Sequence, residues 1–405
     1  MKRRDFLRRL AATASLVPLS SSVAGAWAAP GAGNGRSLVV LFLRGGCDGL
    51  NMVVPYGDGH YYTSRPRIAV APPGTSGASS VLDIDGYFGL HPELAPLQAS
   101  YAQGRLALLP AVHSPDHTRS HFHAQSIVER AGGGAGNGWL NRYLEEFAVS
   151  GQALAISSQL PEALQGQVAV PAFPDPLDRA FSLSGPVDDI LGSVLTRRYV
   201  SGTDPSPGAR KNWVAAAVEL EASRASAPIR TSSSVTYPRG TLGEDLASAA
   251  ALLRESPDLS ILTLAMGGWD THSNQGGASG RQAAQLSALA AGLAAFQDDL
   301  GPRRDDVAVL VQTEFGRTLR ENASGGTDHG GASAWMVLSS TMRGGVHLGT
   351  RGWPGLDEGS LLEGRALAPA VDFRDVYADL LVNHLGCDDV SRILPGRPGE
   401  STGLV

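Results

Sequence analysis

The chain has 405 residues, of which 42% are apolar, so it is able to bury a core and is not a wholly disordered protein. Its formal net charge is −6, lysine is almost absent, and arginine supplies nearly all of the positive charge. Because no basic stripe is present, we expect no nucleic-acid partner. The 50 glycines and 25 prolines predict many loops around a regular scaffold.

The first 28 residues have the pattern of a twin-arginine signal peptide. Arg3-Arg4 precedes an apolar doublet, a weakly apolar stretch runs from 10 to 26, and Ala26-Trp27-Ala28 fits an A-x-A cleavage site. We therefore predict passage through the twin-arginine translocase and a periplasmic or secreted mature protein. An anchored transmembrane helix is the alternative, which the small number of strongly apolar residues disfavours. No later stretch is long and apolar enough to span a bilayer, so the mature form is expected to have no stable membrane span.

Two cysteines, Cys47 and Cys387, lie far apart in the sequence and form no metal-binding motif. An oxidising periplasm allows a disulfide between them, but two cysteines do not define a disulfide framework. Their pairing stays open at this point.

Short apolar runs alternate with helical segments along the chain, which is typical of an α/β layered fold. The runs are continuous rather than alternating, as in parallel strands that are buried on both faces. We predict a mostly parallel central sheet flanked by helices. Pro110 argues that its strand lies at an edge or ends early. The predicted strands are 37–43, 106–112, 259–266, 307–312 and 334–339, and the predicted helices include 242–255 and 282–300.

The mature part, 29–405, is predicted to be one domain with an insertion or cap around 150–235. The latter range contains a Pro/Gly/Ser turn, an Ala-rich helix near 214–224 and a Ser-rich connector, with no recognisable motif.

Acidic and histidine residues follow the predicted strands repeatedly, at the place where open α/β sheets bind ligands. Carboxylates and imidazoles that converge there suit Zn, Mn, Mg or Ca, and the absence of cysteine clusters argues against a structural zinc site. Each residue also has a purely structural interpretation, such as Asp48 in a turn or Ser120 as the N-cap of a helix over 121–130. The grouping at successive strand ends favours a site. The segments are Arg44–Asn51, His113–His123, Gly267–Asn274, Thr313–Thr318 and Thr327–Gly331.

The motifs LFLRGGCDGLN, HTRSHFHAQ, GGWDTHSNQ, TEFGRT and TDHGG, in this order behind a twin-arginine signal, resemble the domain of unknown function 1501 family. That family is grouped with the alkaline phosphatase and sulfatase superfamily. The resemblance implies an alkaline-phosphatase-like fold, two metal ions at the carboxyl end of the sheet, and a nucleophile at a helix N-terminus.

The resemblance also implies roles for particular residues. Ser120 or Thr118 is the expected nucleophile, and an arginine is expected to hold an anionic oxygen of the substrate. The candidates for that arginine are Arg44, Arg119 and Arg317, and the expected metal ligands are Asp48, Asp270, His272, Asp328, His329 and, as a final ligand, His347.

Some features depart from the superfamily pattern. Asp270 and His272 have a D-x-H spacing instead of a wider one, and no sulfatase signature surrounds Cys47. Glu314 directly follows its strand while Asp328 comes fourteen residues later, so either Glu314 is a ligand or a loop brings Asp328 back.

The function these observations favour is an exported, metal-dependent hydrolase of phosphate or sulfate esters, acting on a small anionic substrate. The alternative is a non-catalytic metal-binding or assembly protein of the cell envelope on the same scaffold. A metal-free serine esterase is disfavoured because the chain lacks a G-x-S-x-G motif.

Overall fold

The computed structural model describes residues 35–76, 79–132, 136–147, 152–174 and 234–405, and the statements below concern these ranges. The predicted signal peptide, the predicted helix near 214–224 and most of the predicted insertion lie outside them.

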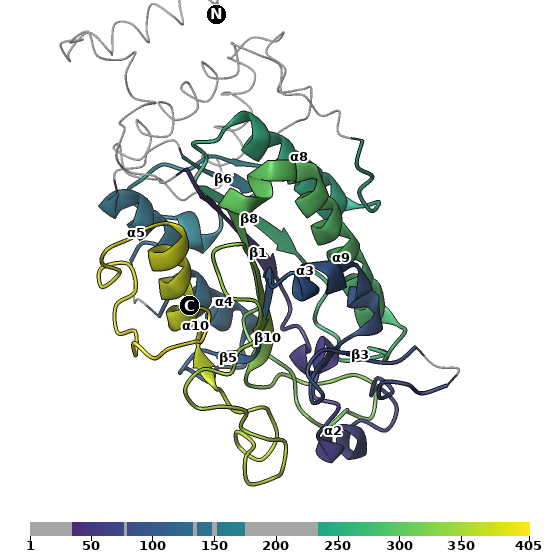
Figure 1. The fold of residues 1–405 in the computed structure, drawn as a ribbon. Coiled ribbons are helices and arrows are strands. Elements are labelled where there is room, and N and C mark those ends of the chain that lie inside the picture. The colour runs from purple at the N-terminus through teal and green to yellow at the C-terminus, as the bar shows by residue number, and fades with distance from the viewer. Residues whose placement is uncertain (1–34, 77–78, 133–135, 148–151, 175–233) are drawn as a thin grey trace, which may run out of the picture. The chain divides into compact units, whose positions relative to one another are not determined.

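A nine-stranded sheet forms the centre of the described part of the chain, with the order β11-β5-β10-β9-β1-β8-β6-β7 and with β12 paired to β5 (Figure 1). Only β10 runs antiparallel to its neighbours, β5 and β9. A separate antiparallel sheet has the order β2-β4-β3. The strands are β1 Ser37–Leu43, β2 Val53–Val54, β3 Leu82–Asp83, β4 Gly89–Leu90, β5 Leu106–His113, β6 Ala153–Ile156, β7 Ala172–Phe173, β8 Ile261–Met266, β9 Val307–Gln312, β10 Ser333–Leu338, β11 Gly345–Val346 and β12 Val371–Asp372.

Helices cover both faces of the large sheet. In Figure 1, α8 and α9 lie on one face, and α4, α5 and α10 lie on the other. The longer helices are α4 His121–Glu129, α5 Trp139–Glu146, α8 Thr241–Glu255, α9 Arg281–Leu300 and α10 Phe373–Asp379. The shorter ones are η2 Gly49–Asn51, α2 Gly59–Ser64, η3 Pro92–Leu97, α3 Gln98–Ala102, η4 Glu162–Leu164, η6 Gly301–Asp306 and η7 Leu380–His384.

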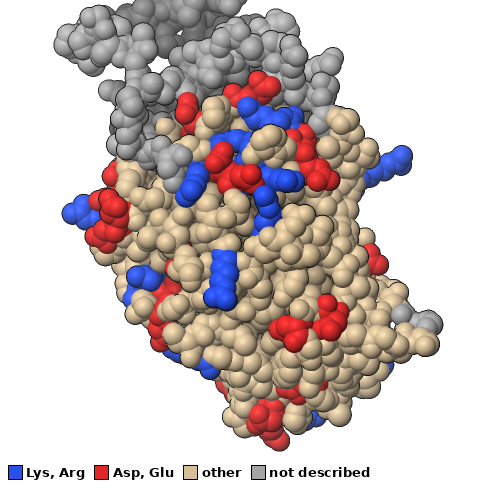
Figure 2. All heavy atoms as spheres, viewed as in Figure 1, with Lys and Arg blue, Asp and Glu red and all other residues tan. Residues whose placement is uncertain are grey.

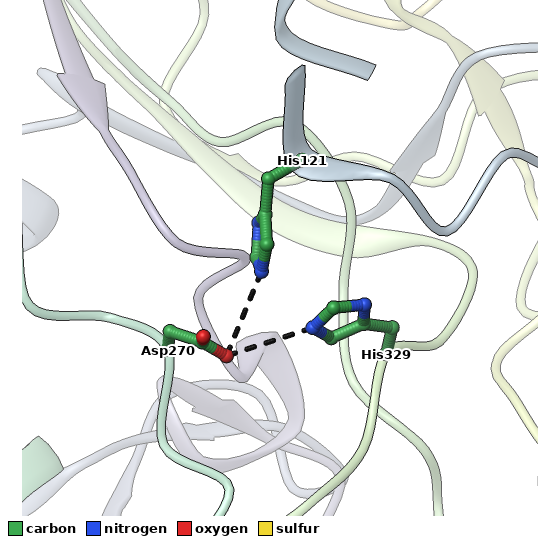
Figure 3. A group of neighbouring side chains, drawn as sticks. All are labelled: His121, Asp270 and His329. Carbon is green, nitrogen blue, oxygen red and sulfur yellow. Dashed lines mark ion pairs between the residues drawn. The ribbon is translucent and has the colours of Figure 1, made fainter. Parts of the chain in front are cut away.

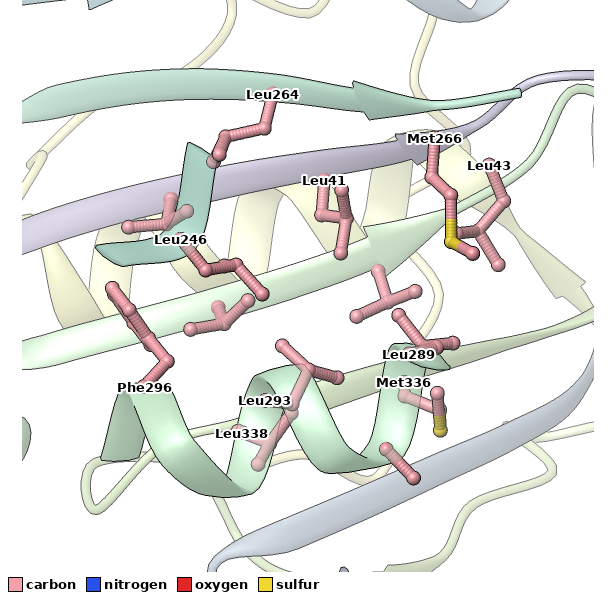
Figure 4. Close-up of a cluster of buried hydrophobic side chains, with 14 of the residues drawn as sticks. Leu41, Leu43, Leu246, Leu264, Met266, Leu289, Leu293, Phe296, Met336 and Leu338 are labelled. Atoms are coloured by element: carbon pink, nitrogen blue, oxygen red, sulfur yellow. The ribbon is translucent and has the colours of Figure 1, made fainter. Parts of the chain in front are cut away.

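The core explains why the strand sequences are apolar without alternation. Leu41 of β1 and Leu264 of β8 face Leu293 and Phe296 of α9, within one buried cluster (Figure 4). On the opposite side, the indole of Trp139 stacks on Tyr377 with ring centroids 4.1 Å apart. A half-exposed strand alternates apolar and polar residues, whereas a strand that is buried on both faces has apolar residues at successive positions.

The predicted α/β class and its five strands are confirmed, with ends that differ by at most two residues. The expectation for Pro110 was wrong, because β5 continues to His113 and has neighbours on both sides. On one side, β11 pairs with residues 107–108 of β5 and β12 pairs with residues 112–113. Pro110 lies in the gap between these two short strands, where its missing N–H costs no ladder hydrogen bond.

The range 150–235 contributes to the large sheet where it is described. β6 pairs with β8, and β7 pairs with β6, both in parallel. Residues 175–233 lie outside the described part.

Cys47 and Cys387 are both free and buried. Burial raises the pKa of the Cys47 thiol well above its ordinary value and that of Cys387 to about 12. Neither thiol has the lowered pKa of a reactive cysteine.

Acidic and basic side chains lie interspersed among wide uncharged areas on the face of the molecule shown in Figure 2. Within the described ranges, no helix combines the length and apolar character needed to cross a membrane.

Candidate metal centre

The topology of the sheet explains why distant polar residues meet. The parallel strands β5, β8 and β9 end at one edge, and β10 starts at that edge because it alone is antiparallel. His121 begins the helix after β5, Asp270 follows β8, and His329 precedes β10. The segment before β10 therefore returns Asp328 to the edge where Glu314 leaves β9.

Four side chains converge on one point at this edge. The Oδ1 atom of Asp270 lies 3.6 Å from Nε2 of His121 and 3.6 Å from Nε2 of His329. Figure 3 shows both imidazoles directed towards this carboxylate. It lies 3.1 Å from Nε2 of His272. The Nε2 atoms of His272 and His329 are 2.9 Å apart. We call His121, Asp270, His272 and His329 the metal cluster.

These spacings fit a bound transition metal. Metal–ligand distances of about 2.0–2.1 Å in a tetrahedron place neighbouring ligand atoms about 3.3 Å apart. Four of the six pairs of ligand atoms in the metal cluster are 2.9 to 3.6 Å apart, on both sides of that value. His121, Asp270 and His329 are also the one group of metal-binding side chains with close ligand atoms in the described part of the chain.

Two of the three imidazoles are held from behind by carboxylates. The Nδ1–H of His121 donates to Oε1 of Glu314 at 2.8 Å, and the Nδ1–H of His272 donates to Oδ1 of Asp328 at 3.0 Å. An ionised carboxylate only accepts hydrogen bonds, so Nδ1 is the donor in each of these contacts, and this tautomer is the one that leaves Nε2 able to bind a metal.

The third imidazole is held by the backbone. The Nδ1–H of His329 donates to the carbonyl oxygen of Arg119 at 2.7 Å. All three rings therefore have an acceptor at Nδ1, and all three Nε2 atoms face Oδ1 of Asp270. Outer partners of this kind fix the tautomer and orientation of metal-binding histidines.

Glu314 is a buried acceptor behind His121. Its Oε1 also accepts from Nε2 of Gln125 at 3.0 Å and from the amide of Gly45 at 2.9 Å. Burial raises the pKa of Glu314, but the hydrogen bonds from His121 and Gln125 outweigh it, and the resulting pKa is below the ordinary value. Glu314 therefore carries a negative charge behind its histidine.

Asp328 plays the same part behind His272. Asn322 donates to Oδ1 of Asp328 at 3.2 Å and to the carbonyl of His272 at 2.8 Å, so its amide holds both residues. Burial raises the pKa of Asp328. The hydrogen bonds from Asn322 and His272 lower it by a larger amount, so the resulting pKa is below the ordinary value.

Asp270 is oriented by Arg317, whose side chain is fully buried. The Nη2 of Arg317 donates to Oδ1 of Asp270 at 2.6 Å. Its other N–H groups donate to the carbonyls of Gly46 and Thr327. Burial raises the pKa of Asp270, but the hydrogen bond and charge of Arg317 bring it below the ordinary value, so the carboxylate is ionised.

Asp48 lies in a different, buried environment. Arg65 binds it bidentately, at 2.6 and 2.9 Å, and Nε2 of Gln275 donates to its Oδ2 at 2.6 Å. Oε1 of Gln275 accepts from the hydroxyls of Thr271 and Thr327. These threonines adjoin Asp270 and Asp328 in the chain, so this network joins Asp48 to the two loops of the metal cluster.

The three candidate arginines differ in what they already bind. The guanidinium of Arg317 already donates to Asp270 and to backbone carbonyls. Arg44 pairs with the buried Glu129 and donates to Gln125 at 2.8 Å. Arg119 is 42% exposed, and its guanidinium pairs with the exposed Glu363.

Ser120 stands between two residues of the site. The carbonyl of Arg119 accepts from His329, and His121 belongs to the metal cluster. Ser120 is exposed and is the N-cap residue of α4, as predicted, but its hydroxyl makes no capping hydrogen bond. The hydroxyl of Thr118 accepts from the amide of Ser120 at 3.3 Å.

His347 is placed away from these residues. It follows β11, its amide donates to the carbonyl of Leu108, and its Nε2 donates to the carbonyl of Arg343 at 2.7 Å. Leu108 lies in the first half of β5, before the edge that carries the metal cluster.

The sequence-based set of ligands omitted His121. The segment HTRSHFHAQ contains several histidines, and only the position of His121 as the first residue of α4 distinguishes it from His123. The supporting amides of Gln125, Asn322 and Gln275 were also not predicted, because no sequence pattern marks them.

The fold and the site together define a class: an α/β protein with a mostly parallel sheet and a candidate metal centre at the carboxyl ends of its strands. A family model described as "Protein of unknown function (DUF1501)" matches residues 35–386. The chain belongs to this family, in agreement with the motifs.

Two solved structures are similar to this chain at a low level. The PsFucS1 sulfatase from Pseudoalteromonas sp. aligns with a TM-score of 0.36 and 12% identity over 91% of this chain and 73% of its own. The lipoteichoic acid synthase LtaP from Listeria monocytogenes aligns with a TM-score of 0.31 and 9% identity over 92% and 75%. Similarity at this level assigns no activity to the chain. No curated protein matches it.

Proposed function

We propose that this protein is a metal-dependent hydrolase of phosphate or sulfate esters. The observation that carries the proposal is the metal cluster itself, in which three imidazoles, each with an acceptor at Nδ1, direct Nε2 towards one carboxylate oxygen of Asp270. A bound divalent metal supplies polarisation of an ester oxygen and a lower pKa for a neighbouring hydroxyl or water.

The donor set favours particular metals. Imidazole nitrogens suit zinc and other transition metals, whereas calcium and magnesium prefer oxygen ligands. We propose one cation, held by the metal cluster, and not two, because the carboxylate of Asp48 is bound bidentately by Arg65.

The metal cluster is open on one side. The side chains of Asp270 and His272 are 47% and 44% exposed. Solvent access at these ligands allows an additional ligand to reach the cation, as in catalytic zinc sites that expand to five-coordinate. A substrate is therefore able to reach the ligands from solvent.

Ser120 is the proposed nucleophile. It is exposed, it makes no capping bond, and its neighbours on both sides contact the site. The first turn of α4 also offers backbone N–H groups that favour an anion.

Arg119 is the proposed anion-binding arginine. Of the three candidates, it alone has a guanidinium whose partner is an exposed carboxylate instead of buried groups. A guanidinium binds two oxygens of a phosphate or sulfate group at once.

The predicted twin-arginine signal complements this proposal. Export in folded form allows the metal to be bound in the cytoplasm, before the protein reaches the periplasm. The translocase is the expected partner during export.

The test is a comparison of metal content and turnover. The mature protein is purified, its bound metal is measured by elemental analysis, and it is assayed with aryl phosphate, aryl phosphodiester and aryl sulfate. We expect about one metal ion per chain, turnover of at least one ester, and loss of turnover in Ser120→Ala with the metal retained. Full activity after exhaustive chelation would contradict the proposal. Stoichiometric metal without turnover of any ester would favour the non-catalytic envelope protein.

A further inference from the structure

A tight turn beside the metal cluster has an unusual residue at its tip. The carbonyl of Leu362 accepts from the amides of Arg365 and Ala366, and between them Glu363 and Gly364 have φ angles of +51° and +65°. Two successive residues with positive φ favour Asn, Asp or Gly at the first position. Asparagine and aspartate tolerate a left-handed backbone because their short polar side chains form hydrogen bonds with the nearby backbone. The longer side chain of glutamate does not, so glutamate is disfavoured there.

The side chain of Glu363 has one clear partner. It forms an ion pair with Arg119, and the two side chains are 53% and 42% exposed. An ion pair exposed to this extent contributes little to folding stability. Stability therefore does not account for a glutamate at a position that favours asparagine.

The ion pair of Glu363 and Arg119 lies close to the metal cluster. Arg365, in the same turn, donates to the carbonyl of His329 at 3.4 Å. The carbonyl of Arg119 accepts from Nδ1 of the same histidine at 2.7 Å. The turn and Arg119 are thus both joined to one residue of the metal cluster, and the ion pair of Glu363 lies at the rim of the site.

We propose that Glu363 is an internal competitor for the anionic group of the substrate. Its carboxylate occupies the guanidinium of Arg119 until a phosphate or sulfate group displaces it, since both kinds of anion bind a guanidinium in the same way. A neutral ligand has no group that replaces the carboxylate, so Glu363 sets both the affinity and the selectivity of the site for anions. The inference rests on the proposed function, because it takes Arg119 as the residue that binds the substrate anion.

The experiment uses inorganic phosphate as the probe and the metal-loaded protein, with binding measured by calorimetry at pH 7.5. The variants are Glu363→Gln, Arg119→Gln and the double variant. Glu358→Gln is the matched control, since it removes an exposed negative charge from the same loop. We expect Glu363→Gln to tighten phosphate binding about three- to tenfold, because it releases the guanidinium. Glu358→Gln is expected to change the affinity less than twofold.

The double variant decides the mechanism. If Glu363 acts through Arg119, the substitution Glu363→Gln has no effect once Arg119 is replaced by glutamine. An equal gain in affinity with and without Arg119 would overturn the inference, because it would reflect only the lost negative charge. A gain equal to that of Glu358→Gln would overturn it as well.

Glu363→Asn provides a second readout. Asparagine tolerates the left-handed backbone, so this variant is expected to have a higher urea midpoint and the same gain in phosphate affinity. A higher midpoint without any gain in affinity would contradict the inference.

The outcomes also separate this inference from the proposed function. The expected binding pattern without turnover of any ester would leave the inference standing and reject the hydrolase. Ester turnover with equal phosphate affinity in all variants would reject the inference alone. Absence of phosphate binding in every variant would also reject the inference.

Discussion

The Nε2 atoms of His272 and His329 lie 2.9 Å apart, and both also face Oδ1 of Asp270. Each ring already donates its Nδ1–H, to Asp328 in one case and to the carbonyl of Arg119 in the other. When both rings are neutral, two lone pairs face each other beside the ionised Asp270. Such an arrangement is favourable when a cation lies between the acceptors.

Removal of one histidine from the metal cluster should abolish tight metal binding. We expect His121→Ala to lower the affinity for zinc more than about 100-fold, because it deletes a direct ligand. Competition with a chromophoric chelator measures this affinity. His123→Ala is the matched control, because His123 is on the same helix but is 60% exposed and pairs with Asp116 instead of with the metal cluster. Equal losses in both variants would contradict the assignment of His121.

Glu314→Gln tests the support behind His121. Glutamine keeps the size of the side chain but removes the charge that the Nδ1–H of His121 faces, so zinc affinity is expected to fall about 10- to 100-fold. Glu162→Gln is the control, since Glu162 contacts Ser126 of the same helix and Arg130, the residue that caps its C-terminus. Unchanged zinc affinity in Glu314→Gln would show that the carboxylate does not act through the histidine.

Asp48→Asn distinguishes a buried ion pair from a metal ligand. The side chains of Asp48 and Arg65 are both fully buried, and the substitution leaves the arginine charge without its partner. We expect the free energy of unfolding in urea to fall by about 3–5 kcal/mol. His272→Gln, at an exposed position of the metal cluster, should lose the metal with a much smaller change in the apoprotein. A stable Asp48→Asn protein without metal would instead identify Asp48 as a ligand.

Much of the fold was predictable because its strands are buried on both faces. Segments such as 37–43 and 307–312 consist of apolar residues without alternation, and both became central strands. The behaviour of Pro110 was not predictable. Its effect depends on which residues of β5 find partners in β11 and β12, and that pairing is set by segments more than 230 residues away.

The site was predictable as a set of segments but not as a set of contacts. Residues at strand ends were identified because parallel strands share an edge, and the antiparallel direction of β10 then returned Asp328 and His329 to it. Direct ligands and outer acceptors were not separable from the sequence, because Glu314, Asp328 and Asp270 are all carboxylates in the predicted site segments. Only the geometry shows that the first two face Nδ1 and the third faces Nε2.

Low pH should destabilise the apoprotein through His384. Burial lowers the pKa of this histidine to about 4, and its neutral ring is bound to the carbonyl of Ser37 and the hydroxyl of Thr341. Its folded pKa is below the unfolded value, so the unfolded chain binds a proton first, and stability is lost as the pH falls from about 6.5 to about 4. Between pH 7.5 and pH 5 we expect a loss of about 2 kcal/mol from this residue.

Urea denaturation with a chelator present, at pH 7.5 and at pH 5, measures this effect. His384→Gln should be less stable at pH 7.5 but should lose about 2 kcal/mol less than the original protein on acidification. The exposed His60→Gln is the control and should follow the original protein. Parallel losses in His384→Gln and the original protein would exclude His384 as the source.

The central claim is that one metal ion is bound by three Nε2 atoms and one oxygen of Asp270. Anomalous diffraction from crystals of the zinc-loaded protein tests it most directly. We predict a single strong peak about 2.0–2.2 Å from Nε2 of His121, His272 and His329 and from Oδ1 of Asp270. A peak bound by Asp48, or zinc located only at other surface residues, would contradict the account.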